Sequence, residues 1–106
     1  MTQALLTVPR TAKKDDVIEV RALIAHPMES GFRPGNDGKT LPRNIITNVE
    51  CRYLNQLVFS ATLYPSVASN PYLSFHLRAA ASGEVVVRWT GDNGFDHSER
   101  AQLDVV

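Results

Sequence analysis

With 106 residues and a formal net charge of zero, the chain has the length of one domain and lacks the basic surplus typical of proteins that bind nucleic acid or acidic membranes. Hydrophobic residues make up 43%, enough for a core, while no apolar run approaches the roughly 20 residues that cross a bilayer. We therefore predict a single domain over residues 1–106, with neither nucleic acid nor a membrane among its partners.

The first predicted strands come before residue 26. Residues 4–8 read ALLTV and predict a short strand that Pro9 closes. Residues 16–26 read DVIEVRALIAH, in which apolar and polar residues alternate as they do in a half-buried strand. The face that we expect to be buried consists of Ile18, Val20, Ala22 and Ile24.

A long loop follows, with the sequence HPMESGFRPGNDGKTLPR at 26–43. Most connections in compact domains have roughly 4–6 residues, and much longer ones are usually functional or disordered. The loop carries Met28 and Phe32 among glycines, prolines and charges. Two interpretations remain open: the loop binds another protein, or it folds back and caps its own core as compact Ω-loops do.

The next segment, NIITNVECRYL at 44–54, predicts a strand with two distinct faces. Alternation places Ile46 with the polar residues Asn48, Glu50 and Arg52, and it places Cys51 on the opposite, more apolar face. A turn at Asn55-Gln56 then leads to a strand at LVFSATLY, after which YPSVASNP forms a loop.

The remaining strands are YLSFHLRAAA, EVVVRWTGDNG and SERAQLDVV. We predict a hairpin at Ser82-Gly83 and a tight turn at TGDNG, where Asp, Asn and Gly favour turn conformations. Val85, Val87 and Trp89 are expected to share one face. About seven strands without a helical period indicate an all-β protein, an immunoglobulin-like β-sandwich, with an open barrel as the alternative.

The chain offers little catalytic chemistry, and we predict no catalytic, cofactor-binding or metal-binding residues. His26, His76 and His97 lie on separate segments without the spacing of metal ligands, so we expect surface or turn histidines. Cys51 is the only cysteine, which excludes an internal disulfide, and we expect a buried, inert thiol. Phe95, at the end of the TGDNG turn, is either a contact residue or a plug for the end of the sandwich.

The motifs HPMESGFR, NDGKTLPRNII, SNPYLSFH and SGEVVVRWTGDNG, taken together and in this order, resemble the SoxZ family, one subunit of the SoxYZ carrier of bacterial sulfur oxidation. The resemblance covers essentially the whole chain. It implies an immunoglobulin-like, non-catalytic scaffold without a cofactor, which forms a heterodimer with a SoxY-like subunit and makes transient contacts with other enzymes of the Sox pathway. The C-terminal tail of that partner bears the carrier cysteine, so the resemblance implies that Cys51 is not the carrier thiol.

The resemblance also implies a periplasmic protein. The first residues, MTQALLTVPRTAKKDD, do not have the pattern of a signal peptide. We therefore expect export together with a partner subunit that bears the signal.

The predicted partner-binding residues are Met28, Phe32, Arg33, Arg43 and Phe95. Met28 and Phe32 would be apolar anchors. Arg33 and Arg43 would pair with acidic groups or attract the anionic sulfur adduct, because guanidinium groups favour oxyanions, although Arg43 could equally bond loop carbonyls. Two other functions remain as alternatives: a small metal-dependent redox enzyme that uses Cys51 with histidines, and a generic protein-binding adaptor.

Overall fold

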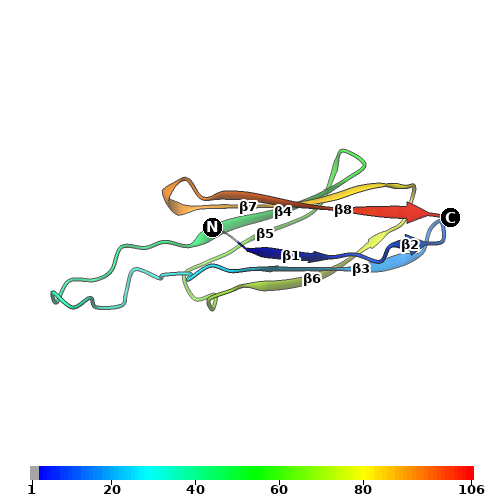
Figure 1. Cartoon of the computed structure of the whole chain (residues 1–106). Coiled ribbons are helices and arrows are strands. Elements are labelled where there is room, and N and C mark those ends of the chain that lie inside the picture. Colours follow the sequence, from blue (N-terminus) through cyan, green and yellow to red (C-terminus); the bar gives the residue numbers. More distant parts are fainter. Residues whose placement is uncertain (1–2) are drawn as a thin grey trace.

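The computed structural model describes residues 3–106 and consists of two packed β-sheets (Figure 1). One sheet has the strand order β1-β3-β6, and the other has the order β2-β8-β7-β4-β5. Among residues 3–106, no helix is long and apolar enough to cross a membrane. The strands are β1 (Ala4–Thr7), β2 (Thr11–Ala12), β3 (Val17–Ile24), β4 (Ile46–Tyr53), β5 (Gln56–Thr62), β6 (Tyr72–Arg78), β7 (Gly83–Gly91) and β8 (Asp96–Val105), with a short 3-10 turn at Asp92–Gly94.

The two-sheet architecture confirms the predicted immunoglobulin-like sandwich. The seven expected strands are all present, and the additional strand is β2, which is too short to show alternation. Side chains of a strand point alternately to its two faces, and this alternation fills the core from both sheets. The inward-facing residues include Val20 and Ile24 on β3, Cys51 on β4, and Val87 and Trp89 on β7.

The predicted faces of the segment 44–54 are wrong at one position. Ile46 was expected on the polar side, but both Ile45 and Ile46 are buried. The pairing of β4 with β7 shifts register between Ile46 and Asn48. Such a β-bulge breaks the strict alternation, so two consecutive isoleucines can both face the core.

The predicted hairpin at Ser82-Gly83 is also wrong, because β6 and β7 belong to different sheets. The chain crosses between the sheets here, and the hydroxyl of Tyr53 fixes the crossing by accepting from the Ala81 N–H at 3.1 Å and donating to the Ala81 carbonyl. Hairpins form instead between β4 and β5 and between β7 and β8. In the first, Leu54 and Asn55 both have positive φ, as tight hairpin turns require.

The N-terminal segment contributes to both sheets. β1 pairs with β3 in one sheet, whereas β2 runs parallel to β8 in the other, with Thr11 opposite Asp104. The Asp104 N–H donates to the Arg10 carbonyl at 3.0 Å, and the Val106 N–H donates to the Ala12 carbonyl at 2.9 Å. This segment therefore joins the two sheets at one edge of the sandwich.

The loop between β3 and β4 forms an arm that extends beyond both sheets (Figure 1). Its two legs are joined by bridges between Glu29 and Asn44 and between Pro34 and Thr40. The molecule is accordingly elongated, with principal extents of 58 × 23 × 18 Å. The base of the arm folds back onto the core, where Met28 and Ile45 are buried, as the capping interpretation predicts. Binding of another protein by the rest of the arm stays a prediction.

Candidate partner-binding site

The motifs that are far apart in the sequence meet at the end of the sandwich from which the arm extends. His26 begins one leg of the arm, and Asn70 lies in the loop before β6. The Asn70 N–H donates to the His26 carbonyl at 2.7 Å, and the Asn70 side-chain oxygen accepts from the His26 N–H at 2.9 Å. The other leg is tied to the β7–β8 turn, where the Asp92 N–H donates to the Ile45 carbonyl at 2.9 Å. The site is therefore a junction of three loops.

His26 lies in the interior of this junction, so the expectation of a surface histidine is wrong, although the residue does lie where the loop begins. Its side chain is buried, and its Nδ1 accepts from the Met28 N–H at 2.9 Å. Nδ1 must then be unprotonated, which leaves the proton on Nε2. The imidazole meets the ring of Phe95 edge to face, with 4.9 Å between the ring centroids. Burial lowers the pKa of His26, and the negative charge of Asp92 opposes this effect only in part.

Met28 is part of the core, so the expectation of an exposed anchor at this position is wrong. Its φ of 51° places the backbone in the left-handed region, which bulky residues rarely adopt. With the backbone in this conformation, the side chain is buried, and Sδ accepts from the Ile46 N–H at 3.3 Å. Met28 therefore fixes the base of the arm to β4 from the inside.

Arg43 pairs with an acidic group of its own chain. Its Nε and Nη2 donate to the two carboxylate oxygens of Asp92 at 2.8 and 2.9 Å. The Ile45 N–H also donates to this carboxylate, at 3.2 Å. The hydrogen bond from Arg43 is the main reason why the pKa of Asp92 is lowered. The guanidinium is half exposed, but its planar fork is already occupied by a matching carboxylate.

The other predicted contact residues divide between the tip and the base of the arm. Phe32 lies near the tip and is 79% exposed, while Arg33 beside it pairs with Glu29 at 2.6 Å. Phe95 is partly buried and packs against the core. Of the two roles left open for Phe95, the structure therefore favours the plug. Contact of Phe32, Arg33, Arg43 or Phe95 with a partner remains a prediction.

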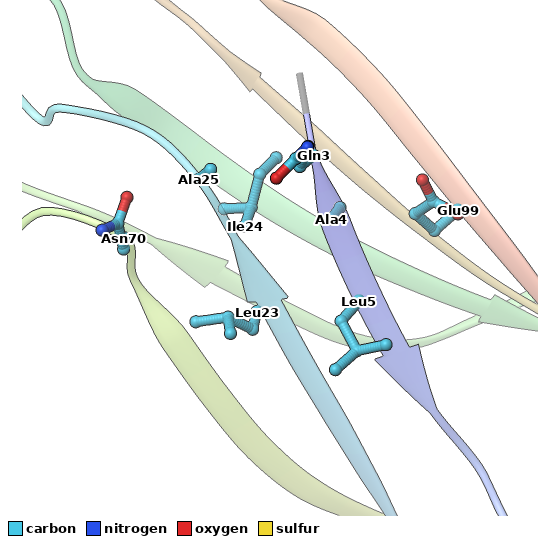
Figure 2. Close-up of a pocket in the computed structure, with 8 residues that line it drawn as sticks. All are labelled: Gln3, Ala4, Leu5, Leu23, Ile24, Ala25, Asn70 and Glu99. Atoms are coloured by element: carbon cyan, nitrogen blue, oxygen red, sulfur yellow. The ribbon is translucent and has the colours of Figure 1, made fainter. Parts of the chain in front are cut away.

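A groove of about 560 Å³ opens beside this junction, between the start of β1 and the end of β3. Figure 2 shows Leu5 and Leu23 on its apolar side, with Gln3, Asn70 and Glu99 as its polar groups. Asn70 therefore belongs both to the groove and to the loop junction. Sequence patterns could not reveal the groove, because its walls come from segments that are distant in the chain.

The thiol and the other histidines lie elsewhere. Cys51 is fully buried, and burial raises its pKa to about 11, as we expected for an inert thiol. The Nε2 of His97 lies 2.8 Å from a carboxylate oxygen of Glu99. Within residues 3–106, no three side chains of His, Cys, Asp or Glu lie together in a way that could hold a metal ion.

The buried histidine predicts a pH dependence of stability. Because the pKa of His26 is lowered in the folded chain, the unfolded chain binds the proton more readily. The free energy of unfolding is therefore expected to fall as the pH drops below about 6.5, the usual pKa of histidine. Urea unfolding between about pH 5 and 7.5 measures this effect. His26→Asn keeps a hydrogen-bond acceptor but cannot titrate, so its stability should change less over this range; an identical pH profile would contradict the prediction.

Comparisons with known proteins were made for both sequence and fold. A family model described as "Sulphur oxidation protein SoxZ" matches residues 6–102. A comparison with curated proteins gave no match. The fold is similar to that of the sulfur carrier protein SoxY from Chlorobium limicola f thiosulfatophilum, with a TM-score of 0.67 and 17% identity over 97% of this chain and 78% of that chain.

It is also similar to superoxide reductase (neelaredoxin) from Ignicoccus hospitalis, with a TM-score of 0.76 and 18% identity over 99% of this chain and 82% of that chain. At such identities, both likenesses show the fold alone.

Proposed function

The chain belongs to the SoxZ family of sulphur oxidation proteins, and from this premise we propose that it is the non-catalytic subunit of a sulfur carrier. In this proposal it pairs with a SoxY-like subunit, and the pair carries covalently bound sulfur intermediates during thiosulfate oxidation. The cysteine that bears the sulfur belongs to the flexible C-terminal tail of the partner. The present chain supplies the rigid body to which the partner binds.

The burial of Cys51 is the observation that carries this proposal. Cys51 is the only thiol in the chain, and it lies in the core with a relative exposure of 0%. A thiol must be deprotonated and accessible to accept a sulfur group. Because burial raises the pKa of Cys51 to about 11, neither condition is met. If the complex carries sulfur, the partner must therefore supply the nucleophile.

The location and the further contacts are part of the same proposal. We place the complex in the periplasm, where the SoxY-like subunit would bring this chain through its own export signal. Other enzymes of the pathway would contact the complex transiently as they process the bound sulfur. The arm supports such contacts, because Phe32 is exposed on it beside the ion pair of Glu29 and Arg33.

Co-expression with the SoxY-like protein from the same source tests the pairing. We expect a stable one-to-one complex, measured by size-exclusion chromatography with light scattering. Cys51→Ala should assemble equally well, because the thiol has no role in carriage. If this chain elutes alone at its mass of 11.7 kDa while the partner is folded, the proposal is wrong.

Metal and thiol analysis of the purified protein separates this proposal from a metal-dependent redox enzyme. That alternative would use the Cys51 thiol together with histidines. Stoichiometric metal, together with a Cys51 that reacts in the folded state, would support the enzyme. A generic adaptor would share the fold but would fail to pair with the SoxY-like subunit.

A further inference from the structure

One long stretch of the chain contains no charged residue. Arg52 and Arg78 enclose residues 53–77, which include no Asp, Glu, Lys or Arg. The chain as a whole is 21% charged, so the stretch differs markedly from its surroundings. It contains all of β5, the loop at 63–71, and all of β6 except Arg78.

The fold brings this stretch to one side of the sandwich. β5 is the last strand of the larger sheet, and β6 is the last strand of the smaller one. The rings of Phe59 on β5 and Phe75 on β6 stack with 4.1 Å between their centroids, so these two edges lie next to each other. We call β5, the loop at 63–71 and residues 72–77 of β6 the uncharged side.

The uncharged side also exposes large apolar residues. A groove of about 320 Å³ runs between the two edge strands, with Gln56 and Val58 from β5 and His76 and Leu77 from β6, and Arg78 lines it where the uncharged stretch ends. Leu54 and Val58 line this groove and are exposed, and the other exposed large apolar side chains of residues 53–77 are Leu57, Tyr64 and Tyr72. Solvent-exposed patches of this kind on a soluble protein mark interaction surfaces.

The outer face of the larger sheet is quite different. It carries ion pairs between Arg52 and Glu50 and between Arg88 and Asp96. Arg100 and Glu84 form a further pair there, at 3.7 Å. Charges are therefore abundant on the exposed face of β4, β7 and β8, whereas β5 and residues 72–77 of β6 carry none.

Free strand edges strengthen the contrast. Among residues 3–106, no strand pairs with the outer edge of β5 or of β6. Soluble proteins usually protect such edges with Lys, Pro, charges or bulges. Neither β5 nor β6 contains Lys or Pro, and the bulge of β5 at Val58, opposite Cys51 and Arg52, leaves Phe59–Thr62 in regular pairing with β4. A strand edge with so little protection is expected to be covered by another protein in the assembled complex.

We propose that the uncharged side is the surface on which the SoxY-like subunit docks, an inference that rests on the proposed function. Charged residues are depleted, and tyrosine is enriched, in the core of protein interfaces. Permanent interfaces are more apolar than transient ones, whereas transient partners are often steered by charge. A surface without charges therefore fits the permanent subunit and not the enzymes that visit the complex.

Lysine substitutions on the co-expressed complex test this surface. Val58→Lys places a charge in the groove between β5 and β6, and Tyr64→Lys places one on the loop that joins these strands. We expect each to weaken the complex about tenfold or more, because a buried unpaired charge is strongly unfavourable in an interface. Val17→Lys is the matched control: Val17 on β3 is 63% exposed, as Tyr64 is, but it lies outside the uncharged side. Titration by light scattering measures the dissociation constants, and thermal unfolding shows whether each variant is folded.

Hydrogen exchange of the wild-type proteins gives a second readout that no folding defect can affect. We expect the amides of residues 56–62 and 72–78 to gain protection when the complex forms. The docking surface is wrong if the complex forms while the exchange of these amides is unchanged. It is also wrong if Leu5→Lys on β1 weakens the complex while Tyr64→Lys and Val58→Lys do not. In both cases the proposed function stands. If the wild-type chains do not associate, the proposed function itself fails and the surface falls with it.

Discussion

Replacing Gly91 by alanine is expected to lower the free energy of unfolding by about 3 kcal/mol, at the upper end of the range for overpacking. A Cβ at this position would lie 2.3 Å from the Ile45 carbonyl oxygen and 2.7 Å from the Ile46 Cα. Both are backbone atoms, which cannot turn away as a side chain can. The backbone would have to move to relieve these contacts. Since Asp92 follows Gly91 directly, this movement should also disturb the hydrogen bonds that the Asp92 carboxylate accepts from Arg43 and from the Ile45 N–H.

Gly83→Ala is the matched control for this experiment. Its new Cβ would also come close to a neighbour, at 2.7 Å, but that neighbour is the end of the Leu54 side chain. Leu54 is partly exposed and can adopt another rotamer, so we expect a loss below about 1 kcal/mol. Urea unfolding of both variants measures the difference. Equal stability of the two variants would show that β7 does not approach the Ile45 backbone as closely as described.

The second large effect concerns the reactivity of Cys51. Its pKa of about 11, against 9.0 for a free thiol, lowers the thiolate fraction at about pH 8 by roughly a hundredfold. Burial adds a steric barrier to any reagent. We therefore expect modification by a chromogenic disulfide reagent to be at least about a hundredfold slower in the folded chain than in denaturant.

Cys51→Ala defines the background of this assay, because it removes the only thiol. Its unfolding midpoint should fall only modestly, since few atoms are removed from the core. A rate in the native protein that equals the rate in denaturant would show that the thiol is accessible. It would also remove the main support for placing the sulfur on the partner subunit.

Much of the fold could be predicted from local alternation, because burial of one face of a strand leaves a period of two in the sequence. This worked for β3 and for β7, whose expected buried residues, among them Val20 and Trp89, are buried. It failed at Ile46, where a bulge interrupts the period. β2 has only two residues and gives no such signal.

Pairing between strands was harder to predict. The Ser82-Gly83 segment has turn-forming residues, but a turn sequence does not determine whether the next strand joins the same sheet or the opposite one. That choice depends on the crossing held by Tyr53 and Ala81, which are distant in the chain. Long-range contacts of this kind leave no periodic pattern.

The candidate site was predicted only in part. The loop at 26–43 was identified by its length, and Phe32 is exposed on it as expected. Met28 is buried and has a positive φ, a backbone conformation that composition alone cannot reveal for a methionine. The convergence of His26, Asn70 and Asp92 was missed for a similar reason: each residue belongs to a separate turn, and only the fold brings the turns together.

The parallel pairing of β2 with β8 has a mechanical consequence. Tension applied upstream of β2 and downstream of β8 acts in opposite directions along two strands that run side by side. The hydrogen bonds from Asp104 to Arg10 and from Val106 to Ala12 then lie across the direction of pulling. Such a load shears these bonds together instead of opening them one after another. The pairing of β2 with β8 is therefore expected to resist extension of the chain between these two strands.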